Sequence, residues 1–187
     1  MFQTLRPLLA LALMLPTWLA AKDRPFVDEP RPMTDRTDIE EPEYWKEGRI
    51  HLPPYPPKEG LQPFQVDAPG SVFHYAIDPG SLSIGADGVV RYALVIESNS
   101  GARNVSYEGM RCDAQAYKTY AYGNGGRWTP LKAPEWHPLS DTAGERYRYQ
   151  LYTFYLCDTD AHKPYPPRQA LQRMRRPGVT DDDNSLL

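Results

Sequence analysis

Two cysteines, Cys112 and Cys157, are the side chains in this 187-residue sequence that could form a covalent link. The first residues of the chain predict export to an oxidising compartment, where an even number of cysteines favours a disulfide over a metal site or a catalytic thiol. Closing a loop of about 45 residues would stabilise the fold by about 4 kcal/mol in the chain-entropy treatment. We therefore predict a disulfide between Cys112 and Cys157, with two buried free thiols as the alternative.

A second group of candidate residues is charged or polar and precedes the first cysteine. The segment 98–112, SNSGARNVSYEGMRC, places Glu108 and Arg111 close together, and Arg91 is expected on the neighbouring strand. Charged groups held in or near a sheet need partners. The favoured interpretation is an internal network that fixes strand register, because structural networks outnumber functional sites. The alternative is a recognition patch for an anionic or polar ligand, made of Arg91, Asn104, Glu108 and Arg111.

Catalytic and metal-binding patterns are weak. The histidines at 51, 74, 137 and 162 are scattered, and no pair has a ligand spacing typical of zinc sites. No Gly-x-Ser-x-Gly nucleophile turn occurs. A hydrolytic site would have to be assembled from dispersed residues, of which His74, Asp78 and Glu108 are the best candidates. We therefore expect no catalytic residue, metal or cofactor to be identifiable, and we favour a protein that is not an enzyme.

The composition limits the class of protein. The formal net charge is −3, so a nucleic-acid partner held by phosphate contacts is not expected. Hydrophobic residues make up 41%, too many for a wholly disordered chain and too few for a bundle of membrane helices. The 20 prolines, half of them between residues 22 and 70, argue against a mostly helical protein.

The N-terminal segment 1–21 has the order of a secretory signal. It carries one basic residue, an apolar run from Leu8 to Leu15 and small residues at its end. Cleavage is expected after Ala21, or after Ala20, with a retained membrane anchor as the alternative. The expected location is the periplasm, with association with the outer membrane as a variant, and with no transmembrane anchor once the signal is removed.

The rest of the chain divides by composition. Residues 22–43 predict a flexible proline-rich leader, and residues 44–160 predict the folded domain. Within the domain, the segment 52–57, LPPYPP, suits a polyproline II strap laid over the domain's own aromatic residues, and a docking motif is the alternative. Residues 161–187 predict a basic helix at 168–176 and an acidic tail. A solvated tail is favoured there, and weak contact with an anionic surface is the alternative.

Short runs rich in Val, Ile, Tyr and Phe predict an antiparallel meander. In the run 89–97, Val90, Tyr92, Leu94 and Ile96 alternate onto one face, so this strand is expected near the centre of the sheet with its second face partly wet. The segment 146–157 fits a strand by composition and a helix by spacing. The strands are expected at 72–77, 81–84, 89–97, 104–112 and 114–122.

The run SLSIGADGVVRYALVIESNSGARNVSYEGMRCDAQAYKTYAYG, followed by Trp128, Trp136 and Cys157, resembles the cryptic neisserial protein-like family, small exported proteins of Gram-negative bacteria. The likeness covers roughly residues 44–157. It implies an envelope location, a domain of unknown function and a helix before the second cysteine, and it supplies no catalytic residues.

These observations predict a mainly β, α+β domain: an antiparallel sheet, as a meander, sandwich or partly open barrel, with short peripheral helices and one disulfide. The expected function is that of a noncatalytic binding or structural protein of the envelope, with an unknown envelope protein or glycan as its partner. The alternatives are a glycan- or peptidoglycan-binding module, for which the aromatic share of 12% is the reason, and a hydrolytic envelope enzyme.

Overall fold

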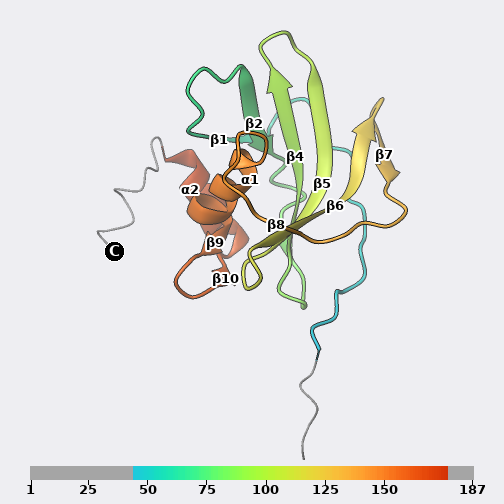
Figure 1. The fold of residues 1–187 in the computed structure, drawn as a ribbon. Helices are drawn as coiled ribbons and strands as arrows, with labels where there is room; N and C mark the ends of the chain where they lie inside the picture. Colours follow the sequence, from blue (N-terminus) through green and yellow to red (C-terminus); the bar gives the residue numbers. More distant parts are fainter. Residues whose placement is uncertain (1–43, 177–187) are drawn as a thin grey trace, which may run out of the picture. The chain divides into compact units, whose positions relative to one another are not determined.

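The computed structural model describes residues 44–176, which form an antiparallel sheet with helices packed against one of its faces (Figure 1). The predicted signal, leader and acidic tail lie outside the described residues. The sheet has eight strands in the order β1-β2-β4-β5-β6-β7, with β3 paired to β4 and β8 paired to β6. Its strands are β1 (Gln62–Phe64), β2 (Phe73–Ile77), β3 (Ser83–Ile84), β4 (Val90–Ser98), β5 (Arg103–Arg111), β6 (Ala116–Asn124), β7 (Arg127–Pro130) and β8 (His137–Pro138). The predicted mainly β fold is confirmed.

Strand β4 lies inside the sheet, between β2 and β5, and both of its faces are covered. Val90, Tyr92 and Leu94 point into the core beneath the helices, as their alternation predicts. The opposite face was expected to be partly wet, but Arg91 and Ala93 are buried there. The cover is the longer segment 44–57, which includes the proline-rich run 52–57 and is called the strap from here on. It lies on this face without joining the sheet.

The proline-rich part of the strap packs on the domain's own aromatic residues, as predicted. The indole Nε1 of Trp128 donates a hydrogen bond of 2.8 Å to the carbonyl of Pro53, and the ring of Tyr55 lies 5.3 Å from that of Trp128. A Cβ atom at Gly123 would meet the Tyr55 ring at 2.8 Å, so glycine is required on β6 beneath the strap. Prolines suit this role because an extended segment outside a sheet needs no backbone donors for a ladder.

The segment 146–157, whose sequence is ambiguous, is helical up to the cysteine. It forms α1 (Arg146–Gln150) and then the π-helical turn η1 (Leu151–Leu156). Leu151 and Tyr155, four residues apart, are both buried against the sheet. The helical spacing therefore outweighs the β-type composition, and the helix implied by the family resemblance is present.

The disulfide predicted from the sequence joins Cys112, just after β5, to Cys157, which opens β9 (Cys157–Asp158). The link crosses from the sheet to the helical layer. The short strand β9 pairs with β10 (Lys163–Pro164), and the chain then enters the last helix.

Helix α2 (Pro167–Arg175) packs on the domain and is not a solvated tail. Its Ala170 and Met174 are buried in the helix-side core, and Arg173 donates a 2.7 Å hydrogen bond to the carbonyl of Phe154. Ala170 and Met174 lie four apart and so share one face of the helix. The folded domain therefore continues past residue 160, through the described residues to Arg176.

Candidate functional site

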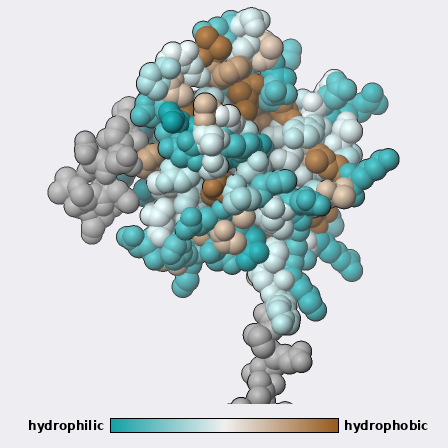
Figure 2. All heavy atoms as spheres, in the orientation of Figure 1, coloured by the Kyte–Doolittle hydropathy of each residue, from teal (hydrophilic) through white to brown (hydrophobic). Residues whose placement is uncertain are grey.

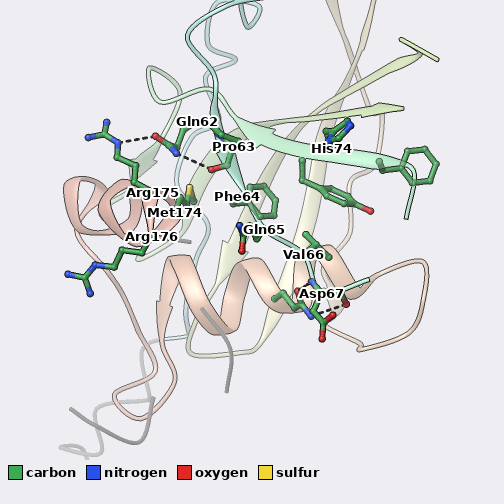
Figure 3. A pocket seen from close by; sticks show the side chains of 13 residues that line it. Gln62, Pro63, Phe64, Gln65, Val66, Asp67, His74, Met174, Arg175 and Arg176 are labelled. Atoms are coloured by element: carbon green, nitrogen blue, oxygen red, sulfur yellow. Dashed lines mark hydrogen bonds between the residues drawn. The ribbon is translucent and has the colours of Figure 1, made fainter. Parts of the chain in front are cut away.

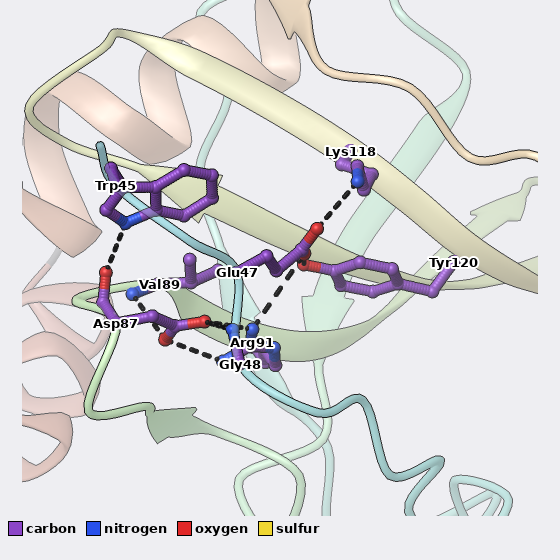
Figure 4. Close-up of polar contacts among 8 residues, drawn as sticks. All are labelled: Trp45, Glu47, Gly48, Asp87, Val89, Arg91, Lys118 and Tyr120. Atoms are coloured by element: carbon purple, nitrogen blue, oxygen red, sulfur yellow. Dashed lines mark hydrogen bonds and ion pairs between the residues drawn. The ribbon is translucent and has the colours of Figure 1, made fainter. Parts of the chain in front are cut away.

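A polar cluster fixes the strap to the sheet (Figure 4). The carboxylate of Glu47 accepts hydrogen bonds from Lys118 at 2.7 Å and from the hydroxyl of Tyr120 at 2.6 Å. Asp87 accepts a 2.6 Å hydrogen bond from Arg91 and a 2.7 Å bond from the backbone of Gly48. The Arg91 guanidinium lowers the pKa of Asp87 to about 2, so this ion pair is intact at neutral pH.

The second arginine on this side, Arg111, is held by an aromatic ring. Its guanidinium lies 3.7 Å from the centre of the Trp45 ring and pairs with Asp113 at 2.6 Å. The Trp45 ring meets that of Trp136 edge to face. Arg91 and Arg111 thus each pair with a carboxylate of the domain itself, and Arg111 also stacks on Trp45. These contacts give the cluster a structural role.

On the opposite face, Glu108 of β5 forms a buried ion pair with Arg148 of α1. Glu108 is 0% exposed, and its two carboxylate oxygens accept Arg148 Nη2 at 2.7 Å and Nε at 3.0 Å. The hydroxyl of Ser106 donates a further bond of 2.8 Å to Glu108. Burial by itself lowers the pKa of Arg148, but its hydrogen bonds to Glu108 more than offset this and hold that pKa above the ordinary value. The pair joins the sheet to its helical layer.

A groove of about 870 Å³ opens between strands β1 and β2 and the helices (Figure 3). Its volume falls within the roughly 300–1,000 Å³ common for small-molecule sites. The apolar part of its lining comes from Phe64, Val66, Phe73, Tyr75 and Met174. The polar part includes Gln62, Asp67, Gln150, Arg175 and Arg176.

Hydrogen bonds hold the groove's walls together. Gln150 of α1 accepts the backbone N–H of Asp67 at 2.7 Å, and the hydroxyl of Tyr155 donates to the carbonyl of Gln65 at 3.0 Å. Arg175 of α2 donates to the side chain of Gln62 at 3.1 Å. Because each bond links a helix to the chain around β1, the groove is formed before any ligand enters.

The four residues of the predicted polar patch lie in separate environments. Arg91 is in the strap cluster, Glu108 is on the opposite face with Arg148, and Arg111 stacks on Trp45. Asn104 is exposed at the other end of β5, where it pairs in register with Ile96. The sequence placed these residues on neighbouring strands, but alternation directs Arg91 and Glu108 to opposite faces of the sheet.

The three candidates for a hydrolytic site are also dispersed. His74 pairs with the side chain of Asn99 at 2.9 Å, and no carboxylate among the described residues forms an ion pair or hydrogen bond with it. Asp78 accepts the backbone N–H of Gly80 in the turn after β2, and Glu108 is paired with Arg148. His74 lines the groove, but the structure does not bring it together with either acid.

Within residues 44–176, no three His, Cys, Asp or Glu side chains come together in a way that could hold a metal ion. In the same part of the chain, no helix combines the length and the apolar character that crossing a lipid bilayer requires.

The fold and the groove define a disulfide-linked domain whose main antiparallel sheet carries helices on one face and the strap on the other. The model of the CNP1-like family matches residues 40–175, and the chain belongs to this family. It is 30% identical over 156 residues to Cryptic neisserial protein 1 of Neisseria gonorrhoeae, a match that covers 73% of this chain and 75% of the relative. No solved structure matches the chain.

Proposed function

We propose that this protein is exported to the periplasm of a Gram-negative bacterium and that its domain binds a ligand noncatalytically in the groove between β1, β2 and the helices. The groove itself carries the proposal. It combines apolar side chains with amide and charged groups in a preformed hollow of about 870 Å³. Proton transfer between a base and an acid needs two groups within hydrogen-bond reach, and His74, the histidine at its rim, pairs instead with Asn99.

Two observations support export, and a third supports a Gram-negative source. Residues 1–21 have the order of a secretory signal, and the domain contains a disulfide, which persists in oxidising compartments. The relative from Neisseria gonorrhoeae adds a Gram-negative source.

Export predicts a processed N-terminus. Mass spectrometry of the protein recovered from a periplasmic extract is expected to find a chain that begins at Lys22, or at Ala21. Replacing Leu11 in the apolar run by Arg is expected to leave the precursor uncleaved, because a charge in that run blocks recognition of the signal. An intact Met1 on the protein from the extract would contradict cleavage.

Binding in the groove predicts site-specific capture in the living envelope. A benzophenone amino acid placed at Phe73, in the groove, is expected to crosslink a discrete molecule in intact cells, whereas the same probe at Tyr122 is not. Phe73 and Tyr122 are matched because they are 49% and 52% exposed on strands of the same sheet. The captured molecule, once identified, must bind the purified wild-type mature chain and lose affinity for the Phe73→Ser variant. Equal capture from both positions would contradict the proposal.

A further inference from the structure

The apolar lining of the groove is suited to aliphatic and aromatic side chains. Met174 lines one end of the groove but is 4% exposed, so the accessible apolar surface comes mainly from other residues. At the groove's other end, Phe73 is 49% exposed, and the adjoining Val72 is 50% exposed. In the view of Figure 2 the surface is mostly hydrophilic, with hydrophobic residues in separate patches, so such exposed apolar side chains stand out.

The two ends of the groove carry opposite charge. Arg175 and Arg176 project from the end of α2 on one side, and Asp67 lies on the other (Figure 3). Arg175 is held by Gln62, but the guanidinium of Arg176 has no hydrogen bond or ion pair with any of the described residues. An exposed guanidinium beside an apolar hollow is well suited to pair with a carboxylate, because its planar fork can bind two oxygens at once.

The rings of the groove are not arranged as a platform for sugars. A platform that holds pyranose rings flat needs two or more open aromatic faces, and Phe73 is the one exposed Phe, Tyr or Trp side chain in the groove's described lining. Among the ring pairs of the described residues, only Tyr75 and Tyr147 stack near parallel, at 20°, and both are half-buried. Phe64, which also lines the groove, is 5% exposed and tilted against Tyr75. The lining therefore favours amino-acid side chains over glycan rings.

We infer that the groove binds an extended segment of a partner protein in which an apolar run is followed by one or more carboxylate side chains. The apolar run lies along Phe73 and Tyr75, and the carboxylates pair with Arg176 and Arg175 at the end of α2. Asp67 disfavours a second carboxylate at the opposite end, so the charges fix the direction in which the segment lies. This inference rests on the proposed function and names the class of ligand.

The test is a selection from a random twelve-residue peptide display library against the full mature chain. The enriched peptides are expected to share an apolar run of three or more residues next to Asp or Glu. A synthetic peptide of the enriched sequence is then titrated by fluorescence polarisation. Replacing its acidic residues by Asn or Gln is expected to weaken binding about tenfold, the loss of one good charge pair.

Two matched pairs of variants locate the binding. Arg176→Glu is expected to lower the affinity for the enriched peptide by about tenfold or more. Arg168→Glu makes the same charge change at the exposed start of α2 and is expected to leave that affinity unchanged. Phe73→Ser is expected to lower this affinity to a similar extent, whereas Tyr122→Ser on β6 is expected to leave it unchanged. All four side chains are exposed, so each variant is expected to fold.

The outcomes separate this inference from the proposed function. The peptide inference would be overturned if the selection enriched no pattern of apolar and acidic residues. It would also be overturned if Arg176→Glu left the affinity for the enriched peptide unchanged. If the benzophenone at Phe73 captures a glycan, and chitohexaose binds the purified mature chain, the groove is a binding site but its ligand is a sugar. If the probe at Phe73 captures nothing and no peptide is enriched, both proposals fail.

Discussion

Replacing Glu108 by Ala should lower the free energy of unfolding by about 3–5 kcal/mol, the range found when one partner of a buried ion pair is removed. Glu108 is 0% exposed and Arg148 is 8% exposed, so water can solvate little of the guanidinium once its partner is gone. Tyr117 and Tyr147 cover the same guanidinium, at 4.1 Å and 4.7 Å from their ring centres. In the Glu108→Ala variant, the positive charge of Arg148 would therefore stay buried between two tyrosine rings without its main partner.

One remaining contact of Arg148 partly compensates for the loss of Glu108 and reduces the expected destabilisation. Glu145, which directly precedes α1, also accepts a hydrogen bond from Arg148, at 2.7 Å. Its side chain is 32% exposed, so it offers a weaker, partly screened interaction. It cannot replace the two hydrogen bonds that Arg148 donates to Glu108 on the sheet.

Equilibrium unfolding in urea, followed by tryptophan fluorescence, measures the effect. The matched control is Asp141→Ala, which breaks the exposed pair of Arg146 and Asp141 and is expected to change the free energy of unfolding by less than about 1 kcal/mol. A double variant, Glu108→Leu with Arg148→Met, should recover part of the loss because no charge remains buried. Equal effects of Glu108→Ala and Asp141→Ala would contradict a buried pair.

The strands and turns of this domain could be predicted because they depend on neighbours in sequence. Alternation along 89–97 places Tyr92 in the core, and Asp87 and Gly88 form the hairpin turn before β4, with Gly88 at a φ of +77°. The proline-rich part of the strap could be predicted too. Prolines at 53, 54, 56 and 57 cannot donate the backbone hydrogen bonds of a sheet strand, and the domain contains aromatic residues on which such a segment can pack.

The partners of the buried charges could not be predicted, because they are distant in sequence. Arg148 lies 40 residues from Glu108 and meets it only because 146–156 is helical, which the ambiguous sequence pattern did not settle. Glu47 meets Lys118 across 71 residues. The groove was missed for the same reason: its walls come from β1, β2 and α2, and no local pattern indicated that α2 packs back on β1.

Removing the disulfide, by replacing Cys112 and Cys157 with Ala, should lower the free energy of unfolding by about 4 kcal/mol. The two residues are 45 apart in the chain, and the link confines that loop in the unfolded protein. A domain of this size is stable by about 5–15 kcal/mol, so the double variant should keep its fold with little margin. Urea unfolding of the variant and of the reduced wild type should give the same value within about 1 kcal/mol, because both lack the same constraint.

The same link should protect the groove more than the sheet. Cys157 directly follows η1, so without the disulfide the helical layer is held to the sheet by packing and by the pair of Glu108 and Arg148. Hydrogen exchange is therefore expected to speed up in 146–157 and in α2 before it does in β4, which is hydrogen-bonded on both sides. Thiol titration of the denatured, unreduced wild type provides the control and should find no free thiol. Two thiols per chain, or uniform exchange across η1 and β4 in the variant, would show that the disulfide does not hold the helices in place.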